Sequence, residues 1–170
     1  KSMLLASESV QDAASHRGRT RREEIKSVAR RLEGVGWWES QIITLPPSLL
    51  FAETPQQIVD RLDRLRHLPH HEAVAWGVHR PERRAVEYTI GTYEEITPGI
   101  FHRLTGVLTS QRLEILSAEI HTLAEGLVLD RFYVQDRDFA GEPPDSRLQD
   151  VCAKLTESPR KPNDQAPKFP

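Results

Sequence analysis

The sequence predicts an α+β fold, in which a helical segment precedes a sheet built in the order strand, helix, strand, strand, helix. Three observations support this prediction. Hydrophobic residues alternate over positions 85–93, as in a half-buried strand, because successive side chains of a strand face opposite sides. Over positions 97–111 their spacing becomes that of a helix, and Thr97 followed by Pro98 is a typical helix start. Two further strands near 115–120 and 127–134, then a helix near 145–155, complete the pattern.

An extra strand is predicted ahead of this unit. Positions 73–79 read AVAWGVH, and a turn at 81–84 directs the chain back onto positions 85–92. In a βαββαβ arrangement a fourth strand would pair with the first, but the region after position 155 is rich in proline. The extra strand at 73–79 therefore takes the edge beside the first strand. We expect the order extra strand (73–79), first strand (85–93), third strand (127–134), second strand (115–120). A slip in the alternation at Ser117–Ala118 indicates a bulge, and positions 123–126 indicate a turn.

Positions 3–68 predict helices. After a weak helical pattern at 3–15, Thr20 and Glu23 form the capping box of a helix that ends near Leu32, with Gly34 as its breaker. Acidic residues are interleaved with the basic residues of this stretch and no aromatic residue lies among them, so a solvated face is favoured over a nucleic-acid patch. These basic residues are Arg17, Arg19, Arg21, Arg22, Lys26, Arg30 and Arg31.

The clearest helix of the chain begins after position 53. Thr54 is its cap, Pro55 occupies the first turn, and Gln57 completes a capping box. Upstream of it, the pair Trp37-Trp38 follows a glycine turn. Paired tryptophans can form a ligand platform, but they more often anchor a connection on a neighbouring surface.

Composition narrows the class of protein. The 170 residues carry a net charge of −2, which gives no general attraction to nucleic acid or to an anionic membrane. No apolar run reaches the ~20 residues of a membrane span, and the amino terminus lacks the apolar core of a secretory signal. A single cysteine, Cys152, excludes an internal disulfide and fits the reducing cytoplasm. From its two ends we expect a piece of a longer protein.

Side chains that could carry chemistry are few. Cys152 lies on the apolar side of the last predicted helix, where packing is the expected role rather than nucleophilic attack. Glu94 and Glu95 are adjacent, so their side chains point apart and do not make an acid/base pair. Four histidines near a helix–strand junction are more typical of exposed loops than of a metal site. They are His67, His70, His71 and His79.

Three motifs follow one another at the centre of the chain. The first is Pro98-Gly99-Ile100-Phe101; the second reads ILSAEIHT at 115–122, and the third reads GLVLDRFYV at 126–134. In these motifs the chain resembles the ACT domain, a small amino-acid-sensing regulatory module, and in particular the first ACT domain of the bacterial PII uridylyltransferase/uridylyl-removing enzymes. The stretch LPPSLLFAETPQQI at 45–58 is similar to the passage that joins the HD-type hydrolase domain of that family to its first ACT domain.

The resemblance implies an ACT-like, ferredoxin-like βαββα sheet with the extra edge strand described above. It also implies that an amino acid binds at the turn before the first helix of the sheet unit. Backbone N–H groups and the dipole at a helix start favour a carboxylate, and glycine lets a ligand approach the main chain closely. The expected ligand-binding residues are Thr97, Pro98, Gly99, Ile100 and Phe101.

Two positions depart from the family pattern. Ile96 stands where the family usually has Asp, and Arg112 stands where it often has Gly. Without that Asp the ammonium group of a ligand lacks an acceptor, which Glu94 or Glu95 would have to replace. For this reason we expect weak or absent binding of glutamine, the amino acid that signals nitrogen sufficiency in this family.

The catalytic signatures of that family, a Gly-Ser with a paired Asp-x-Asp and a His-Asp doublet, are absent from the sequence. We therefore expect a regulatory portion, with a helical linker at 1–70, an ACT-like domain at 71–155 and a disordered tail or linker at 156–170. The resemblance implies that the parent enzyme is a nucleotidyltransferase that uses UTP and Mg²⁺ and modifies a PII signalling protein in the cytoplasm. Two alternatives are an amino-acid-binding ACT module of another regulator and a structural module that forms a homodimer.

Overall fold

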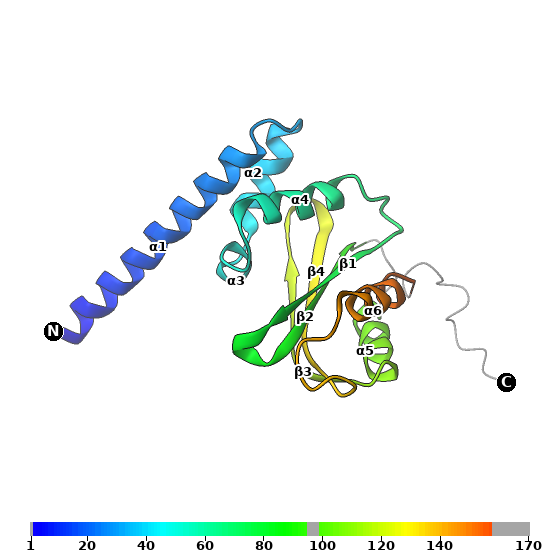
Figure 1. The fold of residues 1–170 in the computed structure, drawn as a ribbon. Helices are drawn as coiled ribbons and strands as arrows, with labels where there is room; N and C mark the ends of the chain where they lie inside the picture. Colours follow the sequence, from blue (N-terminus) through cyan, green and yellow to red (C-terminus); the bar gives the residue numbers. More distant parts are fainter. Residues whose placement is uncertain (1, 95–98, 158–170) are drawn as a thin grey trace. The chain divides into compact units, whose positions relative to one another are not determined.

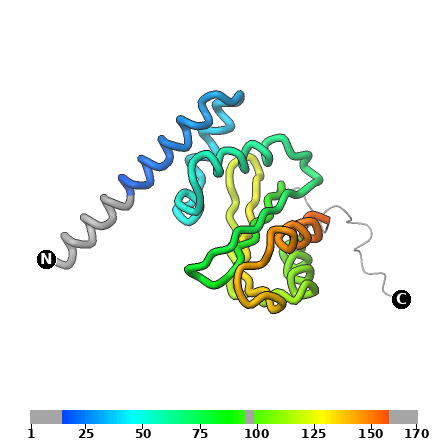
Figure 2. The backbone as a smooth tube through the Cα atoms, viewed as in Figure 1, coloured from blue at the N-terminus to red at the C-terminus, as the bar shows by residue number. Residues whose placement is uncertain are grey.

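The computed structural model describes residues 2–94 and 99–157, with side chains from residue 15 onward. The chain divides into two compact units (Figures 1 and 2). The first runs up to Arg64 and includes the short segment Leu123–Glu125. The second holds Leu65–Thr122 and the part of the chain from Gly126 onward. The predicted tail lies almost entirely at 158–170, outside the described residues.

The first unit is helical, as predicted for this part of the chain. It contains α1 (Ser2–Ala29), α2 (Val35–Thr44), α3 (Pro47–Leu50) and most of α4 (Pro55–Arg66). The expected helix start at Thr20 is wrong, because α1 passes through it without a break. A capping box needs its first residue outside the helix, and nothing before Thr20 ends the hydrogen-bond ladder. Gly34 adopts a left-handed conformation with φ 87°, and it precedes α2 rather than directly ending α1.

Two arginines of α1 are not part of a solvated face. Arg22 donates from Nε to the carbonyl oxygen of Ile42 at 3.2 Å and from Nη2 to that of Leu45 at 2.7 Å. Arg21 donates from Nε to the carbonyl oxygen of Leu50 at 3.0 Å. These carbonyls lie at the ends of α2 and α3, where a helix leaves its last acceptors unpaired. Both arginines therefore cap helices, which the charge pattern of α1 alone did not indicate.

The capping box predicted at the start of α4 is confirmed. The Gln57 amide N–H donates to Thr54 Oγ1 at 3.2 Å, and the Thr54 amide N–H donates to Gln57 Oε1 at 3.0 Å. Pro55 is the first residue of the helix. This local motif forms as its sequence predicts because all its partners lie within one helical turn.

The second unit is a four-stranded antiparallel sheet with two helices. Its strands are β1 (Val74–Arg80), β2 (Ala85–Tyr93), β3 (Leu113–Thr122) and β4 (Leu127–Asp136), in the order β1-β2-β4-β3. This is the predicted order, with the extra strand on the edge beside the first. Helices α5 (Ile100–Ser110) and α6 (Asp145–Glu157) lie on the same face of the sheet (Figure 1). The arrangement is compatible with an ACT-like, ferredoxin-like fold.

The connections of the sheet are short. A 3-10 turn, η1 (Pro81–Arg83), joins β1 to β2, and η2 (Ala124–Gly126) joins β3 to β4 at the turn predicted for 123–126. The bulge lies slightly earlier than predicted. Ile115 pairs with Val134 and Ser117 with Tyr133, so Leu116 is the extra residue of β3. The slip seen in the sequence at Ser117–Ala118 is the place where the alternation resumes. The inserted residue itself comes just before it.

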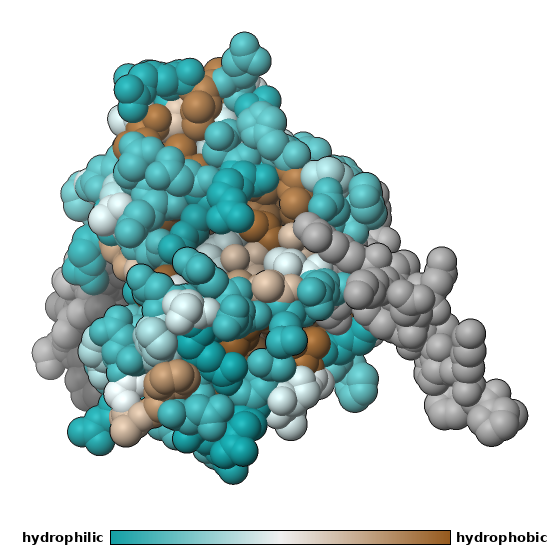
Figure 3. Space-filling model, turned by 45° about the vertical axis from the view of Figure 1, so that its right-hand side comes forward, coloured by the Kyte–Doolittle hydropathy of each residue, from teal (hydrophilic) through white to brown (hydrophobic). Residues whose placement is uncertain are grey.

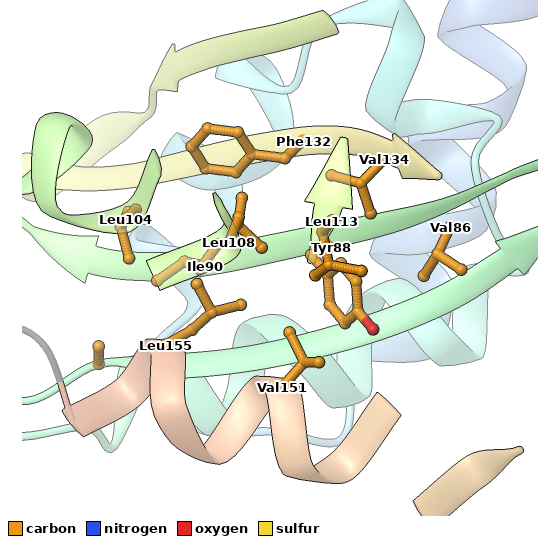
Figure 4. Close-up of a cluster of buried hydrophobic side chains, with 11 residues drawn as sticks. Val86, Tyr88, Ile90, Leu104, Leu108, Leu113, Phe132, Val134, Val151 and Leu155 are labelled. Atoms are coloured by element: carbon orange, nitrogen blue, oxygen red, sulfur yellow. The ribbon is translucent and has the colours of Figure 1, made fainter. Parts of the chain in front are cut away.

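The core of the second unit fills the space between the sheet and its two helices. Val151 and Leu155 of α6 point toward Tyr88 and Ile90 of β2 (Figure 4). Tyr88 fits because Gly77 lies opposite it on β1, where an added Cβ would come 2.7 Å from its ring. The other core residues are Ala73, Val86, Leu104, Leu108, Leu113, Phe132 and Val134, with Leu148 and Cys152 packed at the margin. Cys152 thus has the packing position expected from the sequence.

The surface carries separate apolar residues among many polar ones. Hydrophilic side chains cover most of the face in Figure 3, with small hydrophobic patches between them. In the part of the chain that the structure describes, no helix has the length and apolarity needed to cross a membrane. Among the residues whose side chains are described, the exposed large hydrophobic ones are Val35, Ile43, Phe51, Leu116, Ile120 and Phe139.

Candidate functional site

The amino terminus of α5 is the part of the predicted site that the structure describes. Thr97 and Pro98, with Ile96, fall outside the described residues, whereas Gly99, Ile100 and Phe101 lie within them. Gly99 is the residue before the helix, and its φ of 91° is in the left-handed region. A Cβ at Gly99 would meet nothing within 4 Å, so glycine is needed there for its conformation and not because the site is crowded.

Gly99, the residue before α5, has no side chain with which to cap the helix. No described side chain bonds to the amides at its start, and the turn contains no acidic residue. The Gly99 carbonyl accepts from Arg103 N–H at 3.1 Å, so the helical ladder begins here. An uncapped helix start presents N–H groups and the positive end of the dipole, which together favour an anion such as a carboxylate.

Phe101 fixes the position of this turn over the sheet. Its ring stacks on that of Phe132 in β4, with the ring centroids 5.3 Å apart and an angle of 27° between the planes. Phe132 is fully buried in the core beneath α5 and α6. The start of α5 is therefore held against the helix-facing side of β4.

Asp130 lies two residues before Phe132 on the same strand. Neighbouring side chains alternate along a strand, so Asp130 leaves the sheet on the same side as Phe132. It pairs with Ile90 on β2 and Ile120 on β3. Only 2% of Asp130 is exposed, and its Oδ2 atom has no hydrogen-bond partner among the described residues. Burial raises the pKa of the Asp130 carboxyl to about 6.

Asp130 is not among the site residues predicted from the sequence. It was visible only as the acidic member of the third motif, GLVLDRFYV. The signal that could have found it is a carboxylate at a helix-facing position of an otherwise apolar strand. Glu94 and Glu95 are the two acceptors that the sequence suggested for the ammonium group of a ligand. Glu95 lies outside the described residues. Glu94 is exposed just after β2, and its backbone N–H donates to the Gly126 carbonyl at 2.8 Å.

A charged cluster lies on the opposite side of the sheet from Asp130, and its residues come from all four strands. Arg131 Nη2 lies 3.0 Å from Glu87 Oε1, and Arg131 Nη1 lies 3.4 Å from Glu119 Oε2. Arg80 Nε reaches Glu87 Oε2 at 3.3 Å, and Tyr133 Oη accepts from Arg131 Nη2 at 3.2 Å. We call these five residues the charged cluster.

The charged cluster has the properties of a structural ion-pair network. Burial by itself would raise the pKa of Glu87, but the charge of Arg131 and hydrogen bonds from both arginines outweigh that effect and lower it. Glu87 and Arg131 are almost fully buried, and each has an oppositely charged partner. Such pairing holds Glu87 ionised and unsuited to accept or give a proton near neutral pH.

The other candidate residues do not form a site in the described part of the chain. No group of three or more His, Cys, Asp or Glu side chains is placed to hold a metal ion there. His70 stacks on Tyr93 with the ring centroids 3.9 Å apart. Trp38 is buried in α2 and meets Trp37 edge to face at 5.0 Å, which is the anchoring role preferred from the sequence.

Comparison with known proteins relates part of the chain to one class of enzyme. No protein-family model matches the chain. A segment of 56 residues, 33% of this chain, is 41% identical to part of the bifunctional uridylyltransferase/uridylyl-removing enzyme of Gluconobacter oxydans (strain 621H). The match takes in 6% of the length of that enzyme, so most of the relative has no counterpart in it. A third of the chain therefore supports a relationship to the uridylyltransferase/uridylyl-removing enzymes.

Proposed function

We propose that this chain is a regulatory, ACT-type portion of a uridylyltransferase/uridylyl-removing enzyme that takes part in nitrogen sensing. The observation that carries the proposal is the 41% identity over 56 residues. The strand order β1-β2-β4-β3 with two helices on one face supports it, since an ACT-like sheet has this arrangement. The catalytic steps, with UTP, Mg²⁺ and a PII protein, then belong to the parent enzyme.

The proposed role of the chain is to bind an amino acid at the turn of Thr97, Pro98, Gly99, Ile100 and Phe101. The start of α5 supports this role, because N–H groups at the amino terminus of a helix can receive an α-carboxylate. Glutamine is the first ligand to test. The same site would serve an ACT module of another regulator, so amino-acid binding alone does not separate these two functions.

A pair of measurements tests the proposal. In the first, the chain of residues 1–170 is incubated with PII protein, UTP and Mg²⁺, and we expect no uridylyl transfer. Transfer by this chain would overturn its assignment as a regulatory portion. In the second, each of the twenty L-amino acids is titrated into the chain by calorimetry. We expect at least one of them to bind in a way that Gly99→Val abolishes, while glutamine itself binds weakly or not at all.

Gly106→Ala is the matched control for Gly99→Val. Gly106 lies within α5, away from its start, and an added Cβ there meets nothing within 4 Å. This substitution should leave binding unchanged and raise helix stability by up to about 1 kcal/mol. A chain that binds none of the twenty amino acids would contradict the sensing role.

One observation favours the structural alternative, a homodimerisation module. β3 is an edge strand of ten residues, and its outer side pairs with no described strand. Leu116 and Ile120 on it are 47% and 56% exposed. A long edge with apolar side chains can pair with another strand, and a second copy of the chain is the simplest partner.

A further inference from the structure

We propose that a cavity in the second unit binds a small anion that carries an aromatic ring. The cavity lies at the end of the sheet where β2 begins and β4 ends, and its volume of about 510 Å³ is ordinary for a small-molecule site. Gly99, Ile100 and Phe101 are not among the residues that line it, so it is separate from the amino-acid turn proposed above. The inference goes beyond the proposed function and does not depend on it.

One wall of the cavity comes from the hairpin of β1 and β2. Val86 lines it together with Val134 of β4, and both residues belong to the core of the unit (Figure 4). The wall continues through the turn from Pro81 to Arg84. Arg84 has φ 52°, a left-handed conformation that is uncommon outside glycine, and its N–H donates to the Pro81 carbonyl at 3.1 Å. This hydrogen bond fixes the main chain of Arg84 beside the cavity.

The other wall is the segment that follows β4. Phe139 N–H donates to the Asp136 carbonyl at 3.2 Å, and Arg137 N–H donates to the Arg112 carbonyl at 3.3 Å. Both walls are therefore held by backbone hydrogen bonds within the unit. A cavity that is formed in advance reduces the entropic cost of ordering the protein when a ligand binds.

The charges on the cavity wall favour an anion. Three of its lining residues are basic types: His79, Arg84 and Arg137. Asp136 is the one acid among the described residues that line it, and its Oδ2 atom already accepts from Arg147 Nε at 2.8 Å. The negative charge of Asp136 is thus balanced inside the protein, whereas the arginines of the wall leave an excess of positive charge.

The basic side chains have donors to offer. The Arg84 side chain makes no ion pair or hydrogen bond with the described residues. Arg137 pairs with Glu114 at 3.7 Å, but this pair is exposed and therefore weak. His79 is opposite Val86, so it faces the helix side of the sheet, and its buried Nδ1 atom has no hydrogen-bond partner in the described part of the chain. In the tautomer with a proton on Nδ1, this atom can donate to an anion.

The apolar part of the lining favours a ring attached to the anionic group. Phe139 is 38% exposed at the cavity, and Pro81 and Pro143 present apolar surfaces to it. An aromatic ring packs well against such surfaces, which an inorganic anion would leave uncovered. A guanidinium group binds carboxylate and phosphate alike. The class of ligand that fits both parts of the lining is therefore an aromatic carboxylate or phosphate.

An NMR titration tests the ligand class. Phenyl phosphate, benzoate, phenol and inorganic phosphate are each added to the ¹⁵N-labelled chain of residues 1–170. We expect phenyl phosphate or benzoate to shift the amide signals of Arg84, Arg137 and Phe139, and the stronger of the two identifies the preferred anionic group. Phenol lacks the full charge and inorganic phosphate lacks the ring, so each should bind at least about 10-fold more weakly.

Two results of this titration would overturn the proposal. One is the absence of shifts at these residues with both aromatic anions at about 10 mM, where a ligand of this size and ordinary efficiency would bind. The other is equal binding of phenol or of inorganic phosphate, because the site would then not recognise a charged group and a ring together.

A matched pair of variants tests the role of the arginine. Arg84→Gln should weaken binding of the aromatic anion by about 10-fold, because a charge-assisted hydrogen bond is lost. Arg83→Gln is the control, since it removes the same charge from the neighbouring residue. The Arg83 guanidinium lies 4.1 Å from the centroid of the Tyr133 ring, in the charged cluster on the other side of the sheet. Equal binding by Arg84→Gln and Arg83→Gln would overturn the role of Arg84 and, with it, the proposed site.

A measurement on the unchanged chain locates the ligand without any variant. Nuclear Overhauser effects are recorded between the ring protons of the bound anion and the side chains of the protein. We expect contacts with the Phe139 ring and with the methyl groups of Val86 or Val134, because these residues line the cavity. Binding without contacts to any of the three would place the anion elsewhere and overturn the proposal.

Discussion

Arg147 Nε lies 2.8 Å from Asp136 Oδ2, and this ion pair joins the first turn of α6 to the last residue of β4. The same guanidinium donates from Nη2 to the Gln111 carbonyl oxygen at the end of α5. The hydrogen bond that Arg147 donates to Asp136 raises the pKa of Arg147, which favours its charged form. One side chain therefore ties together the ends of three elements.

Arg147→Ala should lower the free energy of unfolding by about 3 kcal/mol, because it leaves the buried Asp136 carboxylate without its cation. Urea denaturation followed by circular dichroism measures the change. Arg137→Ala is the control, since the Arg137 pair with Glu114 is exposed and spans 3.7 Å, and it should cost less than about 1 kcal/mol. An equal decrease in the free energy of unfolding for the two variants would show that the Arg147–Asp136 pair stabilises the fold no more than an exposed pair does.

Stability should depend on pH through Asp130. The pKa of its carboxyl rises from 3.8 to about 6 on folding, so the folded state holds the proton more tightly. The protonated form stabilises the fold below pH 4, and this contribution, about 3 kcal/mol, is lost as pH rises through 6. Asp130→Asn should therefore increase stability at pH 7.5 and leave it nearly unchanged at pH 3.5.

Comparing the unchanged chain with Asp130→Asn separates the pH dependence due to Asp130 from that due to other acidic residues. The pKa of Glu87 is lowered, so Glu87 contributes stability above its unfolded-state pKa that is lost as pH falls, the opposite direction. Urea denaturation at several pH values, with the unchanged chain and Asp130→Asn measured in parallel, cancels the part due to Glu87. Parallel stability curves for the two chains would show that Asp130 does not titrate as expected.

Arg112 occupies a conformation that favours glycine. Its φ is 63°, and it follows Gln111, the residue at which α5 ends. A non-glycine residue in this region costs about 1 kcal/mol, while its exposed ion pair with Asp138, 2.9 Å long, is worth less than that. Arg112→Gly should raise the melting temperature slightly or leave it unchanged, whereas Arg112→Val should lower it. A clear loss of stability in Arg112→Gly would show that the ion pair outweighs the strain.

Self-association should depend on the outer edge of β3. For the unchanged chain, we expect the average mass measured by light scattering to rise with concentration toward the mass of a dimer. Ile120→Lys should shift the mass to that of a monomer, because charges on an edge strand oppose strand pairing. Ile43→Lys is the control, since Ile43 is similarly exposed at 74% but lies on α2. A monomer mass at every concentration for the unchanged chain would rule out the homodimer.

Much of the fold followed from local sequence patterns. The capping box of Thr54 and Gln57, the hairpin of β1 and β2, and helix α6 each form where the sequence predicted them. Their signals are local, because caps, turns and periodicity depend on neighbours within a few residues. The strand order could also be predicted, since only one edge beside the first strand remained for the extra strand.

The tertiary structure decided those features for which the local sequence is compatible with more than one structure. Thr20 could begin a helix, but α1 continues through it, and Arg21 and Arg22 bind carbonyls of α2 and α3 instead of facing solvent. In β4 the hydrophobic residues do not alternate, since Leu129 and Phe132 are an odd number of residues apart. The strand is regular, but both of its sides are buried, so hydrophobicity no longer marks one face.

In the candidate site, too, some features follow from the local sequence and others depend on the tertiary structure. From the sequence alone, the start of α5 next to Gly99 could be predicted, because a glycine followed by an apolar helical stripe is a local signal. Asp130 could not, because its significance depends on burial and on the absence of a cation from the strands beside it. Alternation along β4 places Arg131 and Asp130 on opposite sides of the sheet, so that one side chain is paired and the other is not. Which side received a counter-charge was settled only when distant strands came together.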